Sequence, residues 1–220
     1  MKHFQEELEG LKNSLLEMGG LVESAIYRSV ASVVEKDADQ AKQVFDNEAR
    51  INQMEISIDE LATRLLALQQ PLATDLRFIT AAIKINNDLE RMGDLAVNIA
   101  ERALSLLQEP PIRPQIDIPR MATLTESMVH RSLDAFVRGD AALARSVLLS
   151  DDAVDNLRDA TYEALIQFME KDAENVRLGV NLMFVARNLE RLADHATNIA
   201  EDVLFLVQGI DVRHHAETRP

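Results

Sequence analysis

The chain has 220 residues, enough for one large domain or two small ones. Its 23 basic and 37 acidic residues give a net charge of −14, which disfavours binding to nucleic acid or to anionic lipid. It contains no cysteine, so disulfides, zinc sites with thiolate ligands and cysteine-bound iron–sulfur clusters are excluded. No segment approaches the roughly 20 apolar residues of a membrane span, and the N-terminus lacks a signal-peptide pattern. We therefore expect a soluble, cytoplasmic protein that binds cations or basic protein surfaces.

The first half of the chain has the apolar spacing of three amphipathic helices. Apolar residues recur every three or four positions until the pattern fades near Lys36. Asp37 or Asp39 can cap a second helix, which breaks at Gln70-Pro71, and a third helix then runs to about Leu107. Only 7 glycines and 6 prolines interrupt the whole chain, which favours long helices packed on one another.

A proline-rich linker divides the chain, because four of the six prolines fall between residues 110 and 119. Helical patterns return after it over 119–138, 141–170 and 174–208, and Gly139-Asp140 separates the first two of these. The prediction is an all-α protein of six long helices, arranged as two similar antiparallel three-helix bundles. The predicted divisions are a first bundle, a linker, a second bundle and a C-terminal tail: 1–108, 109–118, 119–208 and 209–220.

The two halves repeat each other in sequence. Residues 89–101 match residues 189–201 at an offset of 100, and residues 18–41 match residues 121–144 at an offset of 103. Shared apolar periodicity would not by itself reproduce the matching polar residues Glu90/Glu190, Asp94/Asp194 and Asn98/Asn198. An internal duplication therefore spans nearly the whole chain.

Four pairs of polar residues, each spaced i, i+4, stand out in this repeat. Residues four apart lie on one face of a helix, about 6 Å apart along its axis. Folding each half at its break brings residue 50 opposite residue 94, and residue 153 opposite residue 193. In each half, the pair on one helix should therefore meet the pair on the neighbouring helix. The candidate metal ligands are Glu48/Asn52 with Glu90/Asp94, and Asp151/Asp155 with Glu190/Asp194.

Clustered oxygen ligands suit hard or borderline cations, and the candidates considered are iron, Mn²⁺, Mg²⁺, Zn²⁺ and Ca²⁺. These acids point away from the apolar stripe, so the sites should lie on the outer surface of each bundle. The alternative is a solvated network of ion pairs, since Arg91 and Arg187 each lie three residues from an acid. The roles of three further residues are left open by the sequence. His195 is either a metal ligand or a solvated side chain. Arg77 and Arg177, at equivalent places, either tie helices together or bind an anion.

No motif of an enzyme is present. The residues three after Glu90 and Glu190 are Gly93 and Ala193, so the Glu-x-x-His pattern of di-iron bundles is missing. The sequence also lacks glycine-rich phosphate loops, Gly-x-Ser-x-Gly and His-Glu-x-x-His. The prediction is a protein without catalytic activity.

The repeated motif resembles that of the PhoU family. The similarity is carried by the segments 75–77, 88–94, 98–100, 48–55, 189–201 and 209–215, and it covers almost all of the chain. Asn52 departs from the fully acidic pattern of the family. The resemblance implies two three-helix bundles and metal clusters bound by the acidic pairs on the bundle surface.

The resemblance also implies a function. PhoU proteins are cytoplasmic regulators of phosphate uptake that act between the Pst phosphate ABC transporter and the PhoR–PhoB sensor system. They hold the phosphate-starvation response off when phosphate is plentiful. The expected partners are the transporter's ATPase subunit, the PhoR kinase and a second copy in a homodimer, with membrane association only through partners. Two alternatives are a phosphoester hydrolase that uses surface metals and a purely structural helical oligomer.

Overall fold

The computed structural model describes residues 2–69, 71–109, 114–210 and 212, and within them it contains helices and no strand. No helix in these ranges is long and apolar enough to cross a lipid bilayer. Much of the predicted linker (110–113) and of the predicted tail (211 and 213–220) lies outside the described residues. The helices are α1 Lys2–Val34, α2 Ala38–Gln69, α3 Thr74–Leu106, α4 Ile118–Arg138, α5 Ala141–Leu148, α6 Asp151–Lys171 and α7 Asn175–Gln208.

The predicted helix boundaries follow from local capping. The carboxylate of Asp37 accepts hydrogen bonds from the N–H groups of Asp39 and Gln40, at 2.8 and 3.3 Å, so it caps α2. Helix α4 ends where Gly139 takes a left-handed conformation with φ 61°. Asp140 then caps α5 by accepting two backbone N–H groups at 2.9 Å.

The single helix expected over 141–170 is interrupted at Leu149 and Ser150. The N–H group of Ser150 bonds to the carbonyl of Val147 at 2.9 Å, a tight turn in place of the α-helical bond. A residue of another helix holds this turn, because Arg131 of α4 donates to the Ser150 hydroxyl at 2.9 Å. The helix restarts as α6 with Asp151 in its first turn, where the helix dipole favours a negative charge.

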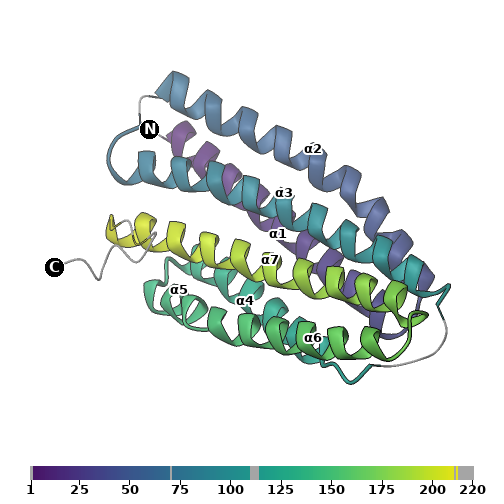
Figure 1. The fold of residues 1–220 in the computed structure, drawn as a ribbon. Helices are drawn as coiled ribbons and strands as arrows, with labels where there is room; N and C mark the ends of the chain where they lie inside the picture. Colours follow the sequence, from purple (N-terminus) through teal and green to yellow (C-terminus); the bar gives the residue numbers. More distant parts are fainter. Residues whose placement is uncertain (1, 70, 110–113, 211, 213–220) are drawn as a thin grey trace.

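The two halves pack through their last helices. Figure 1 shows α3 and α7 running antiparallel through the middle of the molecule, with α2 outside α3 and α6 outside α7. Helices α1 and α4 contact each other behind them. The apolar stripe predicted for the third helix, from Ala82 to Leu106, is buried throughout. The fold is therefore the predicted pair of three-helix bundles, with α5 and α6 together forming the middle helix of the second.

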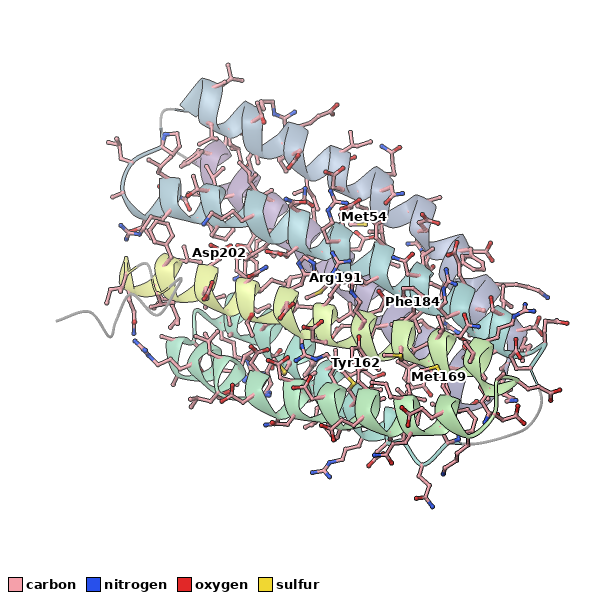
Figure 2. All side chains as sticks on the ribbon, in the orientation of Figure 1. Met54, Tyr162, Met169, Phe184, Arg191 and Asp202 are labelled. Carbon is pink, nitrogen blue, oxygen red and sulfur yellow. The ribbon has the colours of Figure 1, made fainter. Side chains whose placement is uncertain are left out.

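The contact between α3 and α7 has an approximate two-fold symmetry. Lys84 Nζ of α3 lies 2.7 Å from Asp202 Oδ1 of α7. The positions 100 residues away, Phe184 and Arg102, also meet, with the guanidinium 5.3 Å from the ring centroid. Figure 2 shows Asp202 and Phe184 at the two ends of this contact. The duplicated halves thus present equivalent surfaces on either side of the axis.

Candidate metal-binding clusters

The four candidate acids of the second half form one cluster between α6 and α7, called here the second cluster: Asp151, Asp155, Glu190 and Asp194. Burial, together with the charges of Glu190, Asp151 and Asp155, raises the pKa of Asp194 to about 6, and the nearby His195 opposes this shift. Burial also raises the pKa of Asp151, and the charges of Asp155, Asp152 and Glu190 add to that shift. The hairpin of α6 and α7 therefore brings these carboxylates close enough for their charges to act on one another.

Arg158 occupies the second cluster as a resident cation. Its Nη1 atom lies 2.6 Å from Glu190 Oε1 on α7 and 3.0 Å from Asp155 Oδ1 on α6. Its Nη2 atom lies 2.9 Å from Asp159. The arginine side chain is 23% exposed, so these ion pairs are partly shielded from water. One guanidinium thus bridges the two helices and offsets part of the acidic charge.

The first half gathers a different set of acids, called here the first cluster: Glu55, Glu90 and Asp94. Burial raises the pKa of Glu90, and the charges of Asp94 and Glu55 add to this shift. Arg91 lies 3.4 Å from Glu90 Oε2 and 3.3 Å from Asp94 Oδ2 and partly compensates. The acid of α2 whose charge acts on Glu90 is therefore Glu55, one to two helical turns beyond the predicted Asn52 and Glu48.

The predicted register of α2 against α3 explains this difference. A Cβ built on Gly93 would lie 3.3 Å from Ile51 Cγ2, so these two residues face each other, close to the predicted pairing of 50 with 94. In this register Asn52 follows Ile51 and is exposed, and Glu48 lies three residues before Ile51. By the offset of 103, the second-half equivalent of Glu55 is Arg158. The first cluster thus has an acid where the second has a cation.

The donor chemistry of both clusters fits a hard divalent cation, since all seven ligand candidates in them are carboxylates. In the part of the chain that the structure describes, however, no three His, Asp or Glu side chains converge closely enough to hold one ion. The carboxylates turn instead to Arg158 and Arg91. A bound cation would therefore have to displace these arginines.

His195 lies next to the second cluster but points to the other bundle. Its Nδ1 atom is 2.7 Å from Asp88 Oδ1 of α3, and Asn198 donates to the same oxygen at 3.2 Å. Both members of the His195–Asp88 pair are mostly buried. This histidine therefore joins the two halves and is not the solvated side chain that sequence reasoning left open.

The sequence model described as "PhoU domain" matches the chain twice, over residues 15–103 and 118–203. The chain belongs to the PhoU family. Among its relatives, a "Phosphate-specific transport system accessory protein PhoU homolog" from Pseudomonas aeruginosa is 41% identical over 99% of this chain and 90% of its own length. A protein of the same description from Aquifex aeolicus is 39% identical over 97% of this chain and 96% of its own.

Solved PhoU structures share the fold. The crystal structure of PhoU from Pseudomonas aeruginosa superposes with a TM-score of 0.91 at 41% identity, covering 94% of this chain and all of that one. The phosphate transport system regulatory protein PhoU from Streptococcus pneumoniae gives a TM-score of 0.86 at 31% identity, covering 95% and 99%. The resemblance found in the sequence and the all-helical fold class are both confirmed.

The raised pKa of Asp194 in the second PhoU domain predicts a pH-dependent effect of its removal. The folded state holds a proton on this group up to about pH 6, whereas the ordinary value is 3.8, so folding stability falls as pH rises through this window. Asp194→Asn should therefore stabilise the metal-free protein at pH 7. Because the side chain of Asp194 is partly exposed to solvent, we expect the free energy of unfolding to rise by no more than about 1 kcal/mol. This corresponds to a rise of roughly 2–4 °C in melting temperature.

Thermal melts in chelator at pH 7 and pH 4.5 measure this effect, which should be smaller at the lower pH. Glu163→Gln, on the exposed face of the same helix pair, is the matched control and should change little. A lower melting temperature for Asp194→Asn at pH 7 would mean that the acids of the second cluster do not repel one another.

Proposed function

We propose that the chain is a cytoplasmic regulator of phosphate uptake and of phosphate-starvation signalling. In this role it is an adaptor between the Pst phosphate ABC transporter and the PhoR–PhoB system, and it represses the starvation response when phosphate is plentiful. The observation that carries the proposal is the pair of PhoU domain matches covering both halves of the chain. Relatives that match over nearly their whole length are named phosphate-specific transport system accessory proteins.

The shape and charge of the molecule suit an adaptor. Helices of 33 or 34 residues give each half a face about 50 Å long. The net charge of −14 favours basic surfaces on partners, and the approximate two-fold symmetry offers two similar faces to two partners or to a second copy. A membrane transporter would be reached from the cytoplasm through its ATPase subunit. Since relatives are named accessory or regulatory proteins, we propose no catalytic activity.

The acidic clusters are the proposed cation sites of the regulator. The ligands would be Asp151, Asp155, Glu190 and Asp194 in the second half, and Glu90 and Asp94 with Glu48, Asn52 or Glu55 in the first. Iron, Mn²⁺, Mg²⁺, Zn²⁺ or Ca²⁺ would bridge two helices and invert the local charge. In its absence Arg158 joins α6 to α7 in the second half, whereas Arg91 offsets acidic charge of the first cluster from within α3.

The adaptor role predicts direct binding to both partners. We expect the purified full chain to retain the transporter ATPase subunit and the PhoR kinase on a column at physiological salt, and a charge-reversed partner surface to weaken retention. The variant Glu190→Gln with Asp194→Asn separates a cation-dependent contact from a cation-independent one, with Glu163→Gln as the control. Retention of neither partner, with or without Mn²⁺, would rule out the adaptor role.

A further inference from the structure

A cavity of about 440 Å³ opens where the start of α3 meets the C-terminal ends of α4 and α7. It lies away from both acidic clusters. Three cations line it, from three different helices: Lys12, Arg77 and Arg138. Among the described residues Asp75 is the acid in the lining, and Arg138 pairs with Asp134 at 3.0 Å, so Lys12 and Arg77 leave the cavity with a net positive charge. Such a charge is unusual in a chain whose overall charge is −14.

Within the part of the chain that the structure describes, Arg77 has no anionic partner. Its Nε atom is buried without a hydrogen-bond partner, and its Nη2 atom donates only to the Thr74 hydroxyl, at 3.4 Å. A buried guanidinium N–H that is left unpaired costs free energy, so the position favours a ligand that accepts a hydrogen bond. The N-terminus of α3 beside it, which has no side-chain cap, adds positive potential, and the C-terminal ends of α4 and α7 at the same cavity offset part of it.

The other half of the molecule shows what an arginine at this position binds. Arg177 is the equivalent of Arg77, and its Nε atom lies 2.8 Å from Glu109 Oε1, an almost buried carboxylate. The contact is an ion pair without hydrogen-bond geometry, since that oxygen has no hydrogen-bond partner. At the offset of 100, the equivalent of Glu109 is Gly209. The first-half arginine has therefore lost the internal carboxylate that its counterpart keeps.

The cavities beside these two arginines also correspond. Phe78, Phe136 and Leu206 line the first, and their equivalents Leu178, Val33 and Leu106 line a cavity at the opposite end of the molecule. There the chain itself supplies apolar cover, from Pro114, Ile116, Ile118 and Pro119. The counterparts of Lys12 and Arg138 are Gln115 and Glu35, which are not cations. Lys36 is the cation in the lining of this second cavity, against Lys12, Arg77 and Arg138 in the first, so the first is the more cationic of the two.

We propose that this cavity binds a phosphate dianion, either free or as the phosphate group of a small organic monoester. Hydrogen phosphate and phosphate monoesters carry about −1.5 to −2 charges at neutral pH, which the two cations Lys12 and Arg77 would balance. Arg77 presents the planar fork that recognises phosphate, and Lys12 adds a second charge. The stacked rings of Phe78 and Phe136, with centroids 5.9 Å apart, form an apolar wall that would contact the organic part of a monoester. The inference goes beyond the regulatory role proposed above, because it concerns a small ligand and not a protein partner.

Calorimetric titration of the full chain tests the proposal, with inorganic phosphate, phenyl phosphate and acetate as probes. We expect both phosphates to bind and acetate to bind at least about tenfold more weakly. Tighter binding of phenyl phosphate than of inorganic phosphate would identify a monoester as the ligand, and equal binding would identify free phosphate. Arg77→Gln should weaken phosphate binding about tenfold or more, and Lys12→Gln should also weaken it.

Arg177→Gln is the matched control, because it changes the equivalent arginine that already has an internal carboxylate. It should leave phosphate affinity unchanged. Melting curves verify that each variant is folded, and Lys12→Gln, at a half-buried side chain, provides a second reading if Arg77→Gln is unstable. Absence of phosphate binding to the wild-type chain would overturn the proposal, and so would equal weakening by Arg77→Gln and Arg177→Gln.

Discussion

Replacement of Arg158 by methionine is expected to lower the free energy of unfolding of the metal-free protein by about 2–3 kcal/mol. Methionine keeps most of the length of the side chain and removes its charge. The guanidinium pairs with Glu190 at 2.6 Å and with Asp155 at 3.0 Å, in a partly shielded position. Its loss would leave four neighbouring carboxylates with one fewer cation among them. The pKa of Asp194, already raised to about 6, should rise further.

A divalent cation should reverse this loss, if the second cluster is a cation site. At about 100 times its dissociation constant, a ligand that binds only the folded state adds about 2.7 kcal/mol. In wild-type protein the ion must displace the arginine, whereas in Arg158→Met it meets free carboxylates. We therefore expect Mn²⁺ to raise the melting temperature of the variant more than that of the wild type.

Urea unfolding of both proteins in chelator and in Mn²⁺ measures the two effects. Arg64→Met is the control, because Arg64 forms an exposed pair with Glu7 at 3.3 Å and its loss should cost no more than about 0.5 kcal/mol. Unchanged stability of metal-free Arg158→Met would show that the arginine does not hold the acidic cluster together. If Mn²⁺ raised the stability of the variant and of the wild type equally, the ion would bind outside the second cluster.

Features that depend on near neighbours in the sequence could be predicted. The spacing of apolar residues predicted the helices, and Asp37 and Gly139 marked two of their boundaries. The repeat at an offset of 100 predicted the two similar halves. The antiparallel pairing of α2 with α3 also followed, because a short break between long helices leaves only one register. Ile51 faces Gly93 as a result, close to the expected alignment.

Features that depend on contacts between distant segments were missed. The break between α5 and α6 is held by Arg131 of α4, which no local pattern reveals. The acid of α2 whose charge acts on Glu90 is Glu55, because Ile51 opposite Gly93 places residue 54 opposite residue 90. The pairing of His195 with Asp88 requires the packing of one bundle on the other. A comparison of the two halves position by position would have flagged the change from Glu55 to Arg158.

Repression of the phosphate-starvation response is the second large effect that we expect. In a bacterium deleted for its own PhoU protein, a reporter gene under PhoB control should be active even in high phosphate. Expression of this chain should lower the reporter on the order of tenfold, the range of a typical coupling between a regulator and its target. In low phosphate the reporter should stay active, because the proposed regulator would repress only when phosphate is plentiful.

Two variants test whether repression depends on the second cluster and on the cationic cavity. Glu190→Gln with Asp194→Asn should weaken repression if a cation on the second cluster is needed, and Glu163→Gln should leave it intact. Arg77→Gln should alter the phosphate concentration at which repression begins, if the cationic cavity senses phosphate. Each variant is compared at equal protein level, since a loss of folding stability alone lowers abundance.

The reporter in the deleted strain is the most direct test of the regulatory role, because it needs no knowledge of which surface binds which partner. The predicted result is a reporter that is low in high phosphate and high in low phosphate when the chain is expressed. A reporter that remains fully active in high phosphate, with the folded chain present at normal abundance, would contradict a role in phosphate regulation.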